Sequence, residues 1–273
     1  MAVPFYCLAC GQMSDYSPPA RGDLVACAHC GAEQLLPKPN EEHAQEILRH
    51  HGQEREFELA FGDEECIERV SNHIETHLGP ITHVWHEILS DQVHVDVHHV
   101  ETPERQWLVT SGMSSLPMTV PEGVEDWAYA ELCLALPPDW PLSQETRDNH
   151  RHFWPVSSLQ FLARLPHRYS TWLGFGHTIP NGDPPQRVTD GVDFCGGIIA
   201  EPQLAPEEFF ELVVPGQPPI HFWAVYPLYL EELNEKLVAG AETLLDKLQA
   251  AGVTEQLDLG RVNVSLPRKR RRK

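Results

Sequence analysis

Four cysteines near the start of the chain have the spacing of a metal site. Cys7 and Cys10 form one Cys-x-x-Cys pair, and Cys27 and Cys30 form a second pair after sixteen intervening residues. A Cys-x-x-Cys turn lets two thiolates converge on one ion, and two such turns complete a tetrahedral site with four thiolate ligands. A glycine directly follows each pair and relieves crowding where the chain turns back. The sequence therefore predicts one structural Zn2+ per chain.

The residues around these cysteines contain too few apolar side chains to fold by themselves. We expect residues 1–36 to form a small zinc ribbon that folds only around its ion. Residues 37–54 then have the proline-rich and polar composition of a linker with a short helix. The odd number of cysteines, seven, and the paired spacing favour metal over disulfides in a reducing compartment.

A second group of polar residues lies on an expected strand. His94, Asp96 and His98 alternate with valines, so all three share one strand face. Three potential ligands on one face form the most enzyme-like feature of the chain, and a metal-dependent hydrolase built on them is one alternative function. The other interpretation is a polar face that makes hydrogen bonds. The sequence has no complete HExxH, GxSxG, P-loop or GxGxxG motif.

These side chains must be positioned by a mixture of strands and helices. Apolar spacing predicts a helix over 64–78, N-capped by Asp63, a second helix from Pro155 to Pro166, and a third over 228–251 that breaks at Gly240. Strands are expected over 81–89, 92–100, 106–110, 127–136, 169–179, 193–199, 209–214 and 220–226. This order predicts an α+β fold, with a mixed or antiparallel sheet packed with helices, after the zinc ribbon.

The charge is very unevenly distributed. The whole chain carries −20, but residues 267–273 contribute six basic groups, so residues 1–266 sum to −20 − 6 = −26. An acidic body repels nucleic acids and anionic membranes and attracts basic partners. We expect a basic protein partner, with 267–273 as a disordered, solvated tail. A nucleic-acid-associated adaptor that uses the ribbon and the tail is a further alternative.

The sequence shows no signal for export or membrane insertion. No apolar run approaches the ~18 residues of a membrane span, and the first residues lack a charged segment followed by a long apolar one. We therefore expect a cytoplasmic protein.

Several stretches resemble the Suppressor of fused family, in the family's order over roughly residues 55–264. They are HVDVHHV (94–100), LVTSGMSSLPM (108–118), AELCLALPPDWP (130–141), the segment 154–166, GFGHT (174–178) and FWAVYPLYLEEL (222–233). The zinc ribbon lies outside this resemblance. We therefore expect residues 55–266 to form a Suppressor of fused-like domain and the ribbon to be a fused accessory module.

The resemblance implies a non-enzymatic domain that binds other proteins. Eukaryotic members sequester a transcription factor by holding a short extended peptide, whereas stand-alone bacterial members look like immunity proteins that neutralise toxins, often nucleases. This chain lacks the long second region of the eukaryotic form, so the bacterial role is the closer analogy. Partner-binding residues should be exposed and polar, and we expect them in two places: the face of His94, Asp96 and His98, and the loop from His177 to Asp183.

Overall fold

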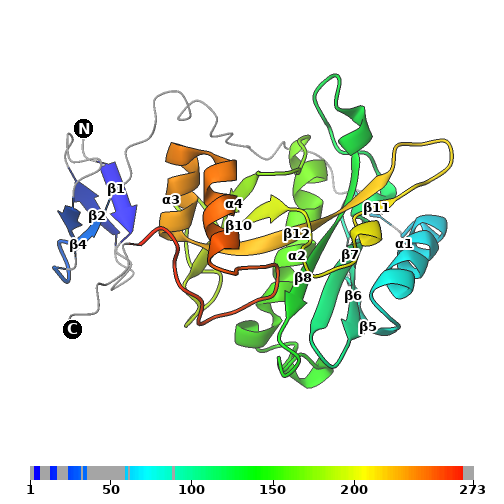
Figure 1. Ribbon diagram of the computed structural model, residues 1–273, viewed down its shortest axis with the longest axis horizontal. Coiled ribbons are helices and arrows are strands. Elements are labelled where there is room, and N and C mark those ends of the chain that lie inside the picture. Colours follow the sequence, from blue (N-terminus) through cyan, green and yellow to red (C-terminus); the bar gives the residue numbers. More distant parts are fainter. Residues whose placement is uncertain are drawn as a thin grey trace.

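The protein is described by a computed structural model that covers residues 3–6, 13–16, 24–31, 33–35, 59–60, 62–87 and 90–266 (Figure 1). Near the start of the chain, β1 (Val3–Tyr6) pairs with β2 (Met13–Tyr16), and β3 (Leu24–Ala26) pairs with β4 (Glu33–Leu35). These are two separate two-stranded sheets, and neither joins the main sheet. The expected short helix within 37–54 and the tail 267–273 lie outside the described residues.

The main sheet has eight strands, in the order β5-β6-β7-β8-β12-β10-β9, with β11 paired to β12 beside this path. The pairing of β8 with β12 is parallel and the other pairings are antiparallel, so the sheet is mixed as expected. Its strands are β5 (Ile81–Trp85), β6 (Asp96–Glu101), β7 (Gln106–Ser111), β8 (Tyr129–Leu136), β9 (Thr178–Pro180), β10 (Phe194–Ala200), β11 (Glu211–Leu212) and β12 (Ile220–Tyr229).

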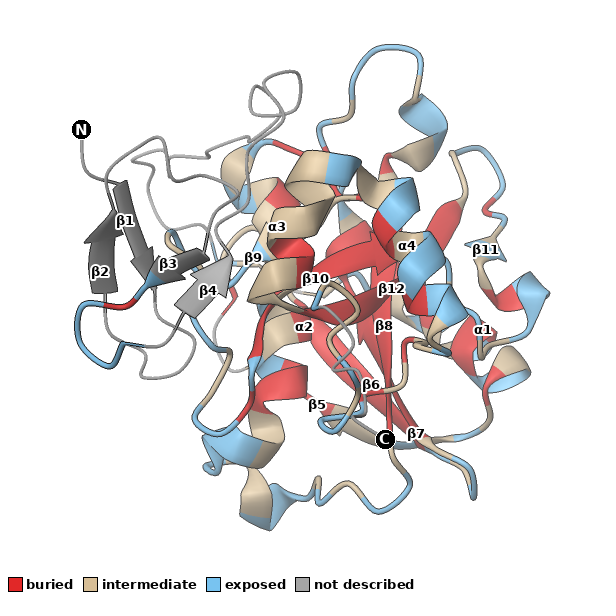
Figure 2. Ribbon diagram, turned by 60° about the vertical axis from the view of Figure 1, so that its left-hand side comes forward, coloured by how far each residue is buried: buried red, intermediate tan, exposed pale blue. Residues whose placement is uncertain are grey.

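Helices cover the two faces of this sheet unequally (Figures 1 and 2). One face packs on α2 (His150–Tyr169), which contacts β6, β7 and β8. The other packs on α1 (Glu64–His77), α3 (Leu230–Ala239) and α4 (Ala241–Ala250), whose buried leucines, valine and isoleucine share one core with the sheet. Within the described residues, no helix has both the length and the apolar character to cross a membrane.

The expected α+β class is confirmed, and several elements follow the sequence closely. The side chain of Asp63 caps α1 by accepting hydrogen bonds from the amides of Glu65 and Cys66. Gly240, at φ 87°, separates α3 from α4 at the predicted break. The strand expected over 92–100 begins only at Asp96, as β6. The predicted alternation is nevertheless present, because Val93 and Val95, just before β6, and Val97 on it join the core beneath α2.

Other elements differ from the sequence-based expectation. Pro155 does not begin a helix and Pro166 does not end one: α2 starts after its cap, Asn149, and continues to Tyr169. Each internal proline removes one helical hydrogen bond, but the helix is retained because one face is packed on the sheet. Of the strand expected over 169–179, only the end forms, as β9. Gly176 turns the chain at φ 77° just before it. The strand expected over 209–214 is shorter in the structure, where only β11 forms.

A buried carboxylate joins the strands at the centre of the sheet. The side chain of Glu131 on β8 is fully buried and accepts four hydrogen bonds: from the Thr110 hydroxyl (2.6 Å), the Gly112 amide (2.9 Å), and both the amide (3.0 Å) and the hydroxyl (2.6 Å) of Ser114. Burial raises the pKa of this carboxyl above its ordinary value, although the four donors oppose the shift. The carboxyl therefore fixes the course of residues 110–114.

We predict that Glu131→Ala lowers the free energy of unfolding by more than about 3 kcal/mol, because each buried donor left without a partner costs about 1–3 kcal/mol. Glu131→Gln should cost less. The side-chain oxygen of glutamine can accept the three hydrogen bonds that Glu131 Oε1 accepts in the wild type. Its NH2 group can donate to the Thr110 hydroxyl oxygen. Chemical denaturation of both variants measures the difference, and equal losses would contradict this account.

The same pair of proteins tests the raised pKa. A carboxyl with a raised folded-state pKa stabilises the protein below its unfolded pKa, about 4.3, and that stability is lost as the pH rises toward the folded value. The stability of the wild type should therefore fall relative to Glu131→Gln above about pH 4.3. A constant difference across the pH range would show that Glu131 titrates at the same pH in both states.

Candidate functional site

The described half of the predicted zinc site is the turn at Cys27–Cys30. Cys27 is buried, and its sulfur accepts a hydrogen bond from the amide of His29 at 3.3 Å. The amide of Gly31, at φ 72°, donates to the carbonyl of Cys27 at 2.9 Å and closes the turn. An amide directed at sulfur is the environment that a thiolate ligand requires, so this turn fits a metal-binding role. Cys7 and Cys10 lie outside the described residues.

The predicted polar face at β6 is occupied by internal contacts. Asp96 is buried, and its carboxylate contacts Nδ1 of His86 (2.8 Å), the amide of Glu87 (3.0 Å) and Nε2 of His94 (3.0 Å). His98 is buried farther along the strand, and burial lowers its pKa below the ordinary value. Of the three predicted residues, His94 and Asp96 are brought together, while His98 is enclosed within the protein.

Ser90, His94 and Asp96 make contacts of the kind found in hydrolases. Ser90 Oγ lies 2.6 Å from His94 Nδ1, and His94 Nε2 lies 3.0 Å from Asp96 Oδ1. However, the Ser90 hydroxyl donates to Glu87 Oε2 at 2.6 Å, so its proton is directed at this carboxylate and not at the imidazole. Ser90 is also only 2% exposed.

This polar network ties the end of β5 to α2 and β6. Arg164 on α2 forms an ion pair with Glu87, and Glu87 also accepts from the amide of Val95 at 3.2 Å. Gln160, one turn earlier on the helix, donates to the carbonyls of Trp85 and Val95. Among the described residues, no three His, Cys, Asp or Glu side chains form a possible metal site. The arrangement therefore supports an anchoring role for these residues.

The second predicted region lies at the opposite end of the sheet. His177 precedes β9, the last strand in the sheet order, whereas β6 is next to the first. Its half-buried ring packs edge-on against Trp172 with centroids 4.5 Å apart, and burial lowers its pKa. Asp183 is exposed on the following loop. The outer edge of β9 offers little for strand addition, since Pro180 has no amide and its carbonyl accepts from Gly182.

A groove runs beside α2, over the part of the sheet that the helix leaves uncovered. It has a volume of 610 Å3, within the ~300–1,000 Å3 typical of ligand sites. One wall is α2, the floor is formed by β8, β12 and β10, and the other wall is β9 with the loop after it. Its lining is mainly apolar and includes Trp154, Pro155, Phe161, Leu162, Ile179, Val188 and Val225.

Glycines make the floor of this groove flat. A Cβ on Gly197 would lie 3.0 Å from Val225 Cγ1, and a Cβ on Gly196 would lie 2.4 Å from the carbonyl oxygen of Ile179. Only glycine therefore lets β9 approach β10 this closely. In the helical wall, Phe161 is 47% exposed, an unusual position for a large aromatic ring.

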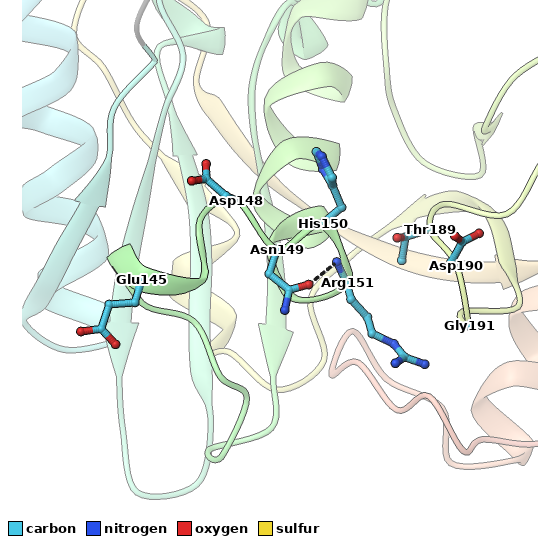
Figure 3. Close-up of a pocket in the computed structure, with 8 residues that line it drawn as sticks. All are labelled: Glu145, Asp148, Asn149, His150, Arg151, Thr189, Asp190 and Gly191. Carbon is cyan, nitrogen blue, oxygen red and sulfur yellow. Dashed lines mark hydrogen bonds between the residues drawn. The ribbon is translucent and has the colours of Figure 1, made fainter.

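One end of the groove opens into a shallow hollow of 700 Å3 with an acidic rim (Figure 3). The two share His150, Thr189 and Asp190. Figure 3 shows the cap of α2, where Asn149 accepts from the amide of Arg151 at 3.1 Å. Glu145, Asp148 and Asp190 are exposed around it. The Arg151 guanidinium lies against Gly191, where a Cβ would come within 2.5 Å of it, and this contact joins the loop to the helix.

Sequence reasoning did not predict this groove. Its lining comes from four strands, a helix and a loop, which only the fold brings together. The Gly196–Gly197 pair within a strand was an available signal, because glycine in a strand often marks a close approach. The exposure of Phe161 could not be inferred from the helical pattern alone.

Comparisons with known proteins agree with this fold. The family model "Suppressor of fused protein (SUFU)" matches residues 91–262. No curated protein matches the chain in sequence. Among solved structures, a chain of "the Sufu-Fu complex crystal structure" is similar with a TM-score of 0.53 and 15% sequence identity, over 73% of this chain and 92% of that chain. The match in sequence covers more than half of the chain, and the similar structure has the same fold. The chain belongs to the Suppressor of fused family.

Proposed function

We propose that this chain is a non-enzymatic protein-binding module, and that it acts as an immunity-type protein that neutralises a basic toxin such as a nuclease. The observation that carries the protein-binding role is the fold similarity to a protein solved as the Sufu-Fu complex. The charge of −26 on residues 1–266 supports a basic partner, because an acidic inhibitor docks rapidly on a basic cleft.

The proposal is tested with the product of an adjacent gene, since toxin and immunity genes lie together. The two proteins are coexpressed and analysed by size-exclusion chromatography, and the growth of cells that express the toxin is compared with and without this chain. A stable complex and restored growth are expected. If the adjacent products are neither toxic nor bound, the immunity role is wrong.

The zinc ribbon remains part of this proposal as a separate module. The turn at Cys27 and Cys30, with its amide directed at sulfur, supports it. Zinc there would stabilise residues 1–36 and would take no part in a reaction at the groove, because a site with four thiolate ligands leaves no open position for substrate.

We predict one tightly bound zinc ion per chain. Cys10→Ser should abolish binding and unfold the ribbon, while the larger domain keeps its cooperative thermal transition. Metal analysis of protein purified without chelators, combined with calorimetry, measures both effects. Absence of zinc and iron would exclude the site, and loss of the main transition in Cys10→Ser would show that the ribbon is not independent.

Electrostatic attraction predicts a salt-dependent rate of association. As the salt concentration rises beyond the physiological value, where the Debye length is about 8 Å, the association rate should fall markedly while dissociation changes less. Stopped-flow mixing with the partner from the adjacent gene provides the measurement. A rate that does not change with salt would mean that the acidic surface serves solubility alone.

The partner-binding residues predicted from the sequence were His94, Asp96, His98, His177 and Asp183. Variants of two of their carboxylates distinguish binding of a partner from anchoring within the protein. Asp96→Asn should lower the free energy of unfolding by about 1–3 kcal/mol, because an amide cannot accept all three of its hydrogen bonds. Asp183→Asn, on an exposed loop, should lower the free energy of unfolding less than Asp96→Asn does. If Asp96→Asn were fully stable but bound the partner weakly, Asp96 would act on the partner rather than within the protein.

A further inference from the structure

The groove beside α2 has features that select a particular kind of occupant. Its interior is apolar and its volume, 610 Å3, has room for more than one side chain. The hollow that continues from it is instead polar. Its lining contains three carboxylates, those of Glu145, Asp148 and Asp190, and one guanidinium, that of Arg151. An occupant that spans both must therefore join apolar groups to positive charge.

We infer that this groove binds a segment of a partner polypeptide in which one or two apolar side chains are flanked by lysine or arginine. This inference rests on the proposed protein-binding function and names the surface and the chemistry of the partner. The apolar side chains enter beside Phe161 and Leu162, and the basic side chains meet the carboxylates of the acidic rim.

Exposed Phe161 is the anchor of this contact. Its ring is 47% exposed to water, and a partner side chain laid against it would bury apolar surface worth about 25 cal/mol per Å2. Aromatic anchors of this kind dominate the binding energy of many interfaces. Phe175, which is 51% exposed but does not line the groove, provides a matched control.

The groove also offers polar groups that suit a peptide backbone. The hydroxyls of Ser157, Ser158 and Thr189 belong to its lining. An extended backbone presents a carbonyl at every residue, so donors along a groove favour a polypeptide over a purely apolar ligand.

The acidic rim acts at longer range. Its three carboxylates are exposed, so they are screened by salt and contribute more to the rate of encounter than to the final affinity. This separates the two parts of the site experimentally. Changes at Phe161 should accelerate dissociation, whereas changes at the rim should slow association.

The experiment uses a phage-displayed library of random short peptides, selected against the full-length chain. Enriched peptides should combine apolar residues with neighbouring lysine or arginine. Binding of one enriched peptide is then measured by fluorescence anisotropy. Phe161→Ser and Ser158→Trp, which remove the anchor and fill the groove, should each weaken binding about tenfold or more, whereas Phe175→Ser should bind like the wild type.

The rim is tested with two triple variants of equal charge change. Glu145→Gln with Asp148→Asn and Asp190→Asn should slow association and reduce its salt dependence. Glu122→Gln with Glu207→Gln and Glu208→Gln removes three exposed carboxylates outside the groove lining and should change association less. All variants are first shown to melt like the wild type, and any that does not is replaced by a conservative change at the same position.

Three results would overturn the inference. One is failure to enrich any peptide, and another is enrichment of peptides without basic residues. The third is equal binding by Phe161→Ser, Ser158→Trp and wild type. If the partner from the adjacent gene still forms its complex with these groove variants, the groove is excluded while the proposed function stands. If neither peptide nor partner binds the intact chain, the proposed function fails as well.

Discussion

The carboxylate of Glu131, buried at the centre of the main sheet, constrains how the two layers of helices can be placed. Taking a carboxylate out of water is costly, and here four donors from residues 110–114 offset that cost. The same five residues touch α1 on one face of the sheet, where Cys66 Sγ lies 3.4 Å from Ser114 Oγ. On the other face His167 of α2 bonds the carbonyl of Met113 at 2.9 Å. One buried acid therefore sets the positions of both helices.

The placement of α2 in turn creates the groove. At its C-terminal end the helix is held by His167, and along its length Arg164 and Gln160 bind the segment between β5 and β6. These contacts keep α2 over one half of the sheet and leave the floor of β12 and β10 uncovered. A Cβ on Gly112 would lie 1.9 Å from the carbonyl oxygen of His94, so this crowded junction also requires a glycine. The binding surface is thus a consequence of contacts that are all internal.

The sequence predicted correctly those elements that are determined by residues close together in the chain. Asp63, Gly240 and the alternating valines each act within a few residues, and the helix start, the helix break and the strand faces follow from them. The prolines of α2 were misleading because packing on the sheet outweighs a missing hydrogen bond. Of the polar pattern of His94, Asp96 and His98, the structure brings only His94 and Asp96 together. Their orientation depends on His86, Glu87, Ser90 and Arg164, which strand periodicity does not reveal. The groove could be recognised only from the tertiary fold, because its lining residues are far apart in the sequence.

The central claim is that a partner binds along α2 and the opposite wall of the groove. Hydrogen–deuterium exchange of the intact chain, with and without a saturating peptide, tests it most directly because it reports every backbone amide at once. The account predicts slower exchange on binding in residues 150–162 and in 178–191, with little change in α1 and β5. Protection confined to α1, β5 or the loop before β6, with none along α2, would contradict it.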